Sequence, residues 1–323
     1  MLNDPPMRSY LEFEKPIAEL EAKIADLKKL VDSGNTDIAE DLEKLEAKAA
    51  QQLQATYAKL GAWQKTQVAR HQDRPHFADY VAGLITDYVP LCGDRAFADD
   101  GAITGGLGRL RGRAVMIMGH EKGRGTEGRV RHNFGMAKPE GYRKAIRLMR
   151  MADRFRLPVV TLVDTAGAYP GVQAEERGQA EAIARAIDCC LDIRVPLVAA
   201  IVGEGGSGGA VALAAANKVL MFEHAIYSVI SPEGCAAILW NDNAKAPDAA
   251  EALRVTADDL LKLKVVDEIV KEPLGGAHRD PGRAISALGD ALDASLRSLT
   301  GQEPGSLREA RRRKFLDMGA TGL

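Results

Sequence analysis

The residues with the clearest chemical potential form one glycine-rich stretch, residues 203–210 (Gly-Glu-Gly-Gly-Ser-Gly-Gly-Ala). It follows the apolar segment 196–202 and precedes an alanine-rich run of helical character. The first amide groups of a helix have no partner within the helix and carry the positive end of its dipole, and glycines let a ligand approach them. The stretch therefore predicts a site for negative charge, and three chemistries compete for it.

The first chemistry is dinucleotide binding by a dehydrogenase. Gly203, Gly205 and Gly208 satisfy the pattern G-x-G-x-x-G. Glu223 follows the first of these glycines by 20 residues, where an acid that binds a ribose hydroxyl is expected. A dinucleotide unit normally opens its domain, however, and strand–helix units already precede this stretch, which disfavours a dehydrogenase.

The second chemistry is that of a serine hydrolase. Gly205, Ser207 and Gly209 satisfy G-x-S-x-G, the pattern of the nucleophile elbow. His278 is the only well-placed late histidine for a triad. The candidate acids before it are Asp258, Asp259 and Asp267. No His-Gly-Gly segment of the kind that supplies an oxyanion hole lies upstream, which disfavours this hypothesis too.

The third chemistry needs only the backbone. Five glycines in the seven positions from 203 to 209 exceed what a tight turn requires. Bare backbone at the start of a helix lets a carbonyl oxygen approach N–H groups, which makes an oxyanion hole without a side-chain nucleophile, suited to enolate chemistry. A similar loop, 164–171 (Asp-Thr-Ala-Gly-Ala-Tyr-Pro-Gly), follows the preceding apolar strand. Because ligands bind at the carboxyl ends of parallel strands, the two loops are predicted to line the same side of the sheet.

The surrounding elements indicate an α/β fold. Continuous apolar segments alternate with amphipathic ones, which is typical of parallel strands joined by helices. The predicted strands are 158–164, 196–202 and 218–223, and the predicted helices between them are 139–155, 173–192 and 208–216. A hairpin of strands 102–110 and 113–119 is expected to open this domain, after a helix over 77–88.

The two ends of the chain are predicted to be helical. Residues 11–70 show helical periodicity broken at Ser33-Gly34-Asn35, which predicts a helical hairpin that packs on a partner or a neighbouring domain. Residues 284–316 return to helix, and the basic run 311–314 is interpreted as one face of it. Residues 121–132 are expected to form a polar loop.

Composition narrows the function further. Forty-three Lys and Arg against 45 Asp and Glu give 323 residues a net charge of −2, without the basic excess of a dedicated nucleic-acid binder. The four cysteines have no C-x-x-C spacing, so no structural zinc site is expected within this chain. No signal peptide is visible, and no apolar run approaches the ~20 residues that span a bilayer. We therefore expect a soluble, cytoplasmic protein.

Taken together, nine stretches make the sequence similar to a known family. They are residues 11–21, 93–100, 133–136, 139–145, 164–171, 174–179, 203–210, 227–235 and 272–279. In order and spacing, from about residue 9 to 316, they resemble the alpha subunits of the bacterial acetyl-CoA carboxylase carboxyltransferases, members of the crotonase-like superfamily. One departure is Ala166, where members usually have proline; this predicts a more mobile loop.

The resemblance implies a crotonase-like spiral of ββα units with helical additions. Residues 1–92 are expected to form an N-terminal helical arm, 93–283 the carboxyltransferase core, and 284–323 the C-terminal helices that complete it. It also implies transfer of a carboxyl group from carboxybiotin, held by the biotin carboxyl carrier protein, to acetyl-CoA, which gives malonyl-CoA for fatty-acid synthesis. The implied partners are a beta subunit in an α2β2 assembly, the carrier protein and biotin carboxylase.

The resemblance also implies site residues. The backbone amides of Gly208 and Gly209 are expected to form the oxyanion hole. The loop that receives the biotin is expected to comprise Gly205, Gly206, Ser207, Gly167, Ala168 and Tyr169. No cofactor is expected to be bound permanently, and zinc is expected only on the beta subunit. The basic residues of 122–131 are expected to hold CoA phosphates, to contact the partner or to form a solvated loop. A non-catalytic scaffold subunit stays open as an alternative, although the intact glycine pair disfavours it.

Overall fold

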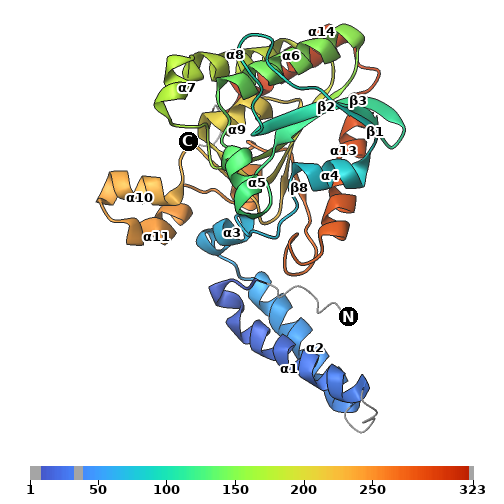
Figure 1. The fold of residues 1–323 in the computed structure, drawn as a ribbon, viewed down its shortest axis with the longest axis vertical. Helices are drawn as coiled ribbons and strands as arrows, with labels where there is room; N and C mark the ends of the chain where they lie inside the picture. Colours follow the sequence, from blue (N-terminus) through green and yellow to red (C-terminus); the bar gives the residue numbers. More distant parts are fainter. Residues whose placement is uncertain (1–8, 33–38, 320–323) are drawn as a thin grey trace.

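The fold is built around one mixed sheet of eight strands, seen in a computed structural model that describes residues 9–32 and 39–319 (Figure 1). The strand order is β1-β2-β3-β4-β5-β6-β8, and β7 pairs with the far end of β5. The first three strands are antiparallel, and the pairings from β3 through β8 are parallel. The bounds are β1 Ile85–Pro90, β2 Ile103–Leu110, β3 Arg113–His120, β4 Val159–Thr165, β5 Leu197–Gly206, β6 Lys218–Phe222, β7 Ile226–Ser228 and β8 Glu268–Val270.

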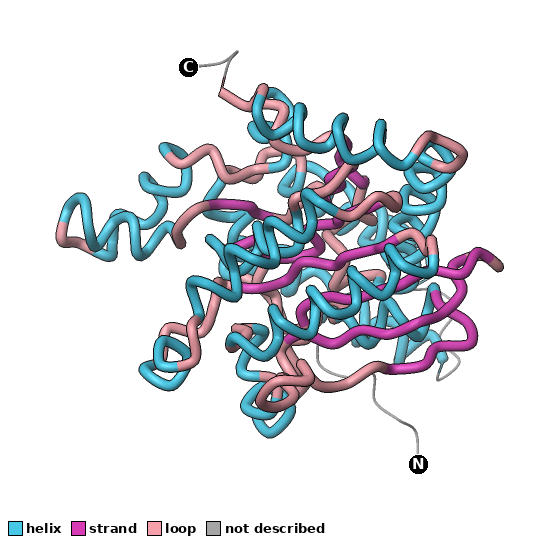
Figure 2. The backbone as a smooth tube through the Cα atoms, turned by 90° about the horizontal axis from the view of Figure 1, so that it is seen from above, coloured by secondary structure: helices cyan, strands magenta, loops and turns pink. Residues whose placement is uncertain are grey.

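Helices cover both faces of this sheet (Figure 2). All seven residues of β4 are buried, as are the first nine of β5, which explains their continuous apolar sequence. The helix bounds are α1 Lys15–Asp32, α2 Ala39–Tyr57, α3 Ala62–Ala69, α4 Phe77–Leu84, α5 Gly125–Arg131, α6 Pro139–Phe155, α7 Val172–Glu176, α8 Gln179–Asp192, α9 Ser207–Ala214, α10 Pro232–Trp240, α11 Ala246–Ala252, α12 Ala257–Lys262, α13 Pro281–Leu299 and α14 Pro304–Leu316. Among the described residues, no helix combines the length and the apolar character needed to cross a bilayer.

The predicted alternation of helix and strand is confirmed between α6 and β6, with one break. The helix predicted over 173–192 is divided into α7 and α8, because Gly178 adopts a left-handed conformation (φ 78°) between them. The predicted hairpin is β2 and β3. The two predicted loops therefore lie at the carboxyl ends of β4 and β5, as the sequence predicts.

Two local predictions are wrong. The helix predicted over 77–88 ends at Leu84, and Ile85–Pro90 forms edge strand β1 instead. This strand approaches β2 closely at Gly106, where a Cβ atom would overlap the carbonyl oxygen of Val89, so the pairing depends on that bare backbone. The segment 121–132 is not a loop throughout, because Gly125–Arg131 forms α5.

The N-terminal helices α1 and α2 pack against each other and extend away from the sheet (Figure 1). Their predicted turn at residues 33–35 lies outside the described residues. The base of the hairpin is fixed to the body through Glu14, which accepts hydrogen bonds from Tyr57 Oη (2.9 Å) and Arg279 Nη1 (3.3 Å). The boundaries predicted for the arm and the core stay predictions.

The basic run near the C-terminus lies on α14, as predicted, but not all of it faces solvent. Arg311 is fully buried. Its guanidinium donates to the carbonyl oxygens of Cys190, Ile193 and Val195 and to Oδ1 of Asn217. These carbonyls lie at the end of α8 and before β5, so the buried cation fixes α14 to the sheet by meeting unpaired backbone acceptors.

Candidate active site

The predicted glycine loop is a direct passage from strand to helix. Strand β5 extends through Gly206, and α9 begins at Ser207 without an intervening loop. Ser207 makes the turn in a left-handed conformation (φ 52°), which is rare for a residue with a side chain. No side chain caps the first turn of α9. The first amides of this helix, including that of the half-buried Gly208, therefore have no side-chain acceptor at the N-cap.

The two predicted loops lie against each other, as the sequence indicated. A Cβ atom on Gly206 would overlap the carbonyl group of Ala166. A Cβ atom on Gly209 would lie 2.8 Å from the backbone nitrogen of Ala168 and 2.9 Å from the carbonyl carbon of Gly167. Gly206 and Gly209 are thus required because the backbone of residues 166–168 lies too close to leave room for a side chain.

Gly208 differs from its neighbours. A Cβ atom there would lie 3.4 Å from Ile183 Cγ2, so the chain's own packing leaves room for one. Gly208 is half-buried and lines a mainly apolar pocket of about 440 Å³. The pocket is bounded by Ser207, Gly208, Val211, Tyr227, Ser228, Val229, Leu253, Leu260 and Val265. Bare backbone that faces a pocket at a helix N-terminus is the arrangement expected for an oxyanion hole.

The loop 164–171 is held by its own hydrogen bonds. Thr165 Oγ1 accepts from the Gly167 N–H (3.1 Å) and donates to the Gly167 carbonyl (2.8 Å). The Tyr169 N–H donates to Ala137 O (3.0 Å), and the Tyr169 ring lies 5.2 Å from Lys138 Nζ. Tyr169 and Gly167 therefore belong to a fixed loop, although Ala166 is exposed at its surface.

A buried cluster of charges lies directly beside the two loops. Lys122 Nζ donates to Asp164 Oδ1 (2.8 Å) and to Glu204 Oε1 (2.9 Å). Arg70 donates from Nε to Glu204 Oε2 (2.6 Å) and from Nη1 to Glu233 Oε1 (2.5 Å). The side chains of Asp164 and Glu204 are 5% and 9% exposed, and together with Arg70 and Lys122 they line a cavity of about 230 Å³. We call Arg70, Lys122, Asp164 and Glu204 the charge cluster.

The charges in this cluster stabilise one another. Burial by itself raises the pKa of a carboxyl group, but the Lys122 ammonium, together with the nearby His76 ring and the hydrogen bond from the Glu204 N–H, outweighs it and holds the pKa of Asp164 well below its usual range. Burial opposes Lys122 and Arg70 in the same way at Glu204, whose pKa is also lowered. Burial disfavours the charged Lys122 ammonium, yet the two carboxylates raise its pKa. All four groups are therefore charged near neutral pH.

The structure does not assemble a dinucleotide site from the predicted residues. Gly203 lies inside β5, three residues before the strand ends, and not at the turn into the helix. It is bare because a Cβ atom would overlap the carboxylate of Asp164. Glu223 is paired with Lys271 Nζ (2.8 Å).

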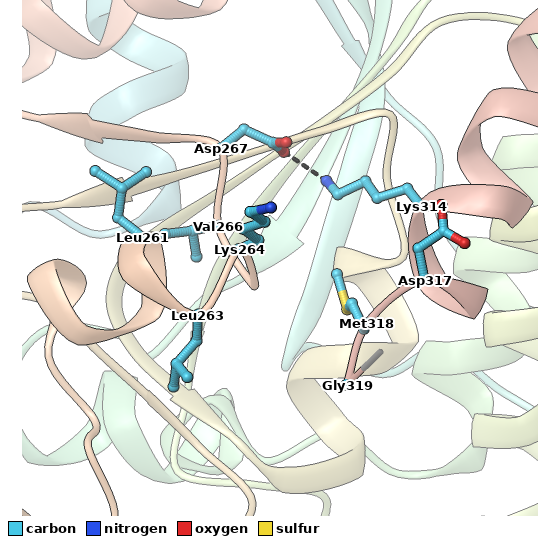
Figure 3. A pocket seen from close by; sticks show the side chains of 9 residues that line it. All are labelled: Leu261, Leu263, Lys264, Val266, Asp267, Lys314, Asp317, Met318 and Gly319. Atoms are coloured by element: carbon cyan, nitrogen blue, oxygen red, sulfur yellow. Dashed lines mark hydrogen bonds and ion pairs between the residues drawn. The ribbon is translucent and has the colours of Figure 1, made fainter. Parts of the chain in front are cut away.

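The residues of the predicted hydrolase triad are also engaged elsewhere. The His278 ring stacks on His71, with ring centroids 3.9 Å apart, and neither of its ring nitrogens has a hydrogen-bond partner among the described residues. The three candidate acids each have another partner: Asp258 pairs with Lys65, Asp259 accepts from Thr256, and Asp267 pairs with Lys314. The last pair lies at a separate pocket of about 450 Å³ near the C-terminal helix (Figure 3).

The charge cluster is what sequence reasoning missed. Lys122 was placed in a polar loop with Arg124, but it points into the protein, and Arg124 pairs with Asp79 (2.7 Å). The available signal was an acid at the end of each of two otherwise apolar strands, Asp164 and Glu204, because a buried carboxylate needs a buried cation.

Comparison with known proteins identifies the family of this chain. The model of the family described as acetyl co-enzyme A carboxylase carboxyltransferase-like matches residues 10–319. The chain belongs to this family. It is 68% identical to the acetyl-coenzyme A carboxylase carboxyl transferase subunit alpha of Rhizorhabdus wittichii, over 313 residues that cover 97% of this chain and 100% of the relative. Of the three chemistries, the backbone oxyanion hole is the one that suits this carboxyltransferase family.

Solved structures with the same fold are more distant. Transcarboxylase 12S matches with a TM-score of 0.59 at 18% identity, over 71% of this chain and 42% of that chain. The beta subunit of geranyl-CoA carboxylase from P. aeruginosa matches with a TM-score of 0.54 at 18% identity, over 76% and 47%. This chain matches less than half of the length of either solved protein. At 18% identity the similarity concerns the fold alone. The predicted crotonase-like α/β fold is confirmed.

Proposed function

We propose that this chain is the alpha half of a carboxyltransferase that moves a carboxyl group from carboxybiotin to acetyl-CoA and so forms malonyl-CoA. The observation that carries the proposal is the start of α9, where no side chain caps the helix and Gly208 presents bare backbone to a pocket. The reaction is inferred from family membership. The geometry at the start of α9 supports a mechanism in which backbone amides stabilise negative charge.

The chemistry requires donors for negative charge and no covalent nucleophile. Carboxybiotin, when bound, supplies the carboxyl group and leaves negative charge on its ureido oxygen. We assign the amides of Gly208 and Gly209 to that charge, because they are fixed by the turn at Ser207 and by the loop 164–171. Each such donor typically contributes ~3–4 kcal/mol to the transition state. Gly205, Gly206, Ser207, Gly167, Ala168 and Tyr169 then shape the entry for biotin.

A second subunit completes the proposed enzyme. Large apolar side chains are exposed at the pocket, where Val229 is 76% exposed, and on α10, where Ile238 and Leu239 are 74% and 65% exposed. Exposed apolar side chains of this size support a protein partner. We propose a beta subunit, bearing the zinc, in an α2β2 assembly that receives the biotin carboxyl carrier protein charged by biotin carboxylase, in the cytoplasm.

The test is transfer from malonyl-CoA to biocytin, with this chain purified together with whatever binds it stoichiometrically. We expect acetyl-CoA production that depends on both biocytin and the partner, and zinc in the partner after the chains are separated. A folded, partner-bound complex without transfer would contradict the carboxyltransferase function.

The oxyanion assignment is tested at Gly208. Gly208→Val places two methyl groups beside the first amides of α9, and we expect transfer to fall about 10²–10³-fold while the complex still forms. Gly208→Ala is the matched control for folding, since its methyl group meets only ordinary contact with Ile183. Ser207→Ala should change transfer by no more than about threefold. A Ser207→Ala enzyme as inactive as Gly208→Val would contradict the assignment.

A further inference from the structure

The charge cluster sits where the two site loops leave the sheet. Asp164 is the sixth of the seven residues of β4, and Glu204 is followed in β5 only by Gly205 and Gly206. Lys122 comes from the segment before α5, and Arg70 directly follows α3. Neither cation is adjacent in sequence to either loop, so the cluster joins four separate parts of the chain at one point.

The backbone pairing of the two strands is interrupted at this point. Val163 pairs with Ile201 and Thr165 with Gly205, so three residues of β5 oppose one residue of β4. Within the interruption, Asp164 Oδ1 accepts the Glu204 N–H at 2.9 Å. The Asp164 carboxylate thus takes the place of a backbone carbonyl as the acceptor for the Glu204 N–H. This hydrogen bond fixes the position of the last residues of β5, directly before α9 begins.

Lys122 holds this arrangement together electrostatically. Its ammonium lies within 2.9 Å of both carboxylates, which without it would face each other as like charges in a buried site. Arg70 holds Glu204 from a second side and extends the cluster to Glu233 of α10. The ion pairs of Lys122 favour a single arrangement of Asp164 and Glu204, because moving either carboxylate away from the ammonium would leave a buried charge unpaired.

We propose that Lys122 is a positioning residue for the reaction, with Arg70 in support. It keeps β4 and β5 in the register that sets the first amides of α9 against the loop 164–171, and it does so from the wall of a cavity of about 230 Å³ that shares no lining residue with the pocket at Gly208. This inference rests on the proposed function, since it concerns the placement of the amides of Gly208 and Gly209. A displacement of about 1 Å in such donors is enough to cost about 10²-fold in rate.

The experiment uses the complex of this chain with its partner. Lys122→Met should lower kcat about 10²-fold and leave KM for malonyl-CoA within about threefold, since the lost interaction acts on the transition state. Lys122→Arg keeps the charge and should recover most of the activity. Lys314→Met is the matched control, because Lys314 is also 17% exposed and ion-paired but lies at another pocket.

A second variant separates positioning from stability. Lys122→Met/Asp164→Asn removes, together with the cation, the carboxylate that does not pair with Arg70, so it should regain much of the stability lost in Lys122→Met, while kcat stays low. Amide hydrogen exchange over residues 203–210 gives a readout independent of activity. Exchange there should be at least about tenfold faster in Lys122→Met and unchanged in Lys314→Met.

Two results would overturn the inference. One is a Lys122→Met complex with unchanged kcat and unchanged exchange; the other is recovery of kcat together with stability in the double variant, which would make the cluster a stabilising device only. Absence of transfer in the unaltered complex would count against the proposed function instead. In that case the exchange measurement still decides whether Lys122 fixes the glycine segment.

Discussion

Two lysines of equal exposure show how differently buried charge is used in this protein. Lys122 and Lys314 are each 17% exposed and each forms an ion pair within 3 Å. Lys122 bridges two carboxylates that belong to neighbouring strands of the sheet, Asp164 and Glu204. Lys314 meets one carboxylate, Asp267, between α14 and the segment before β8 (Figure 3).

Their pKa values move in opposite directions. Burial disfavours both ammonium groups, but two carboxylates raise the pKa of Lys122 above its ordinary value. At Lys314 burial outweighs the single carboxylate, and Lys218 and Arg311 add repulsion, so the pKa is lowered. Equal exposure therefore does not mean equal contribution: the number and identity of fixed partners decide it. The strongly held lysine is the one beside the proposed active site.

The largest expected difference is in stability. Lys122→Met leaves the buried Asp164 carboxylate without its ammonium partner, while Glu204 keeps Arg70, and we expect the free energy of unfolding to fall by about 3–5 kcal/mol. Lys314→Met should cost about 1 kcal/mol or less, since Asp267 still accepts the Val219 N–H at 2.6 Å. Urea unfolding of the two variants beside the unaltered chain measures both. If both variants lose the same free energy of unfolding, the additional carboxylate partner of Lys122 does not increase the contribution of this lysine to stability.

This contrast could not be read from the sequence. Strands β4 and β5 were predictable from their continuous apolar sequences, and helix α6 from its amphipathic pattern. The two loops were predictable from their glycines. The charge cluster was not predictable, because its members come from residues 70 to 204 and meet only through the fold. Strand β1 was missed for a related reason: its pairing depends on the bare backbone of Gly106, a contact between two segments.

A smaller difference is expected in the response to pH. The lowered pKa values of Asp164 and Glu204 contribute stability that is complete above their ordinary values of 3.8 and 4.5 and is lost as the pH falls further. The raised pKa of Lys122 contributes stability up to pH 10.5 that is lost only above it. The stability gap between the unaltered chain and Lys122→Met should therefore stay constant between about pH 6 and 9 and narrow below about pH 5.

Lys314 should behave with the opposite sign. Because folding lowers its pKa, the folded state favours loss of the proton, and the unaltered chain should gain stability relative to Lys314→Met as the pH rises toward 10.5. Urea unfolding of the three proteins across pH 4–10 checks both signs. A gap that widens for Lys122→Met on acidification would contradict the charge assignment of the cluster.

The smallest effect is expected at Ala166, where the family resemblance predicts proline. Ala166→Pro should stabilise the chain by about 0.4–1 kcal/mol by restricting the unfolded state, provided that the loop already has the conformation that proline requires. If the charge cluster fixes that conformation, the gain should be present in the unaltered chain and reduced in the Lys122→Met background, where Asp164 has lost its cation. A double-mutant cycle from urea unfolding measures this coupling. Additive effects would mean that the loop 164–171 is ordered by its own hydrogen bonds at Thr165, and that Lys122 acts through β5 alone.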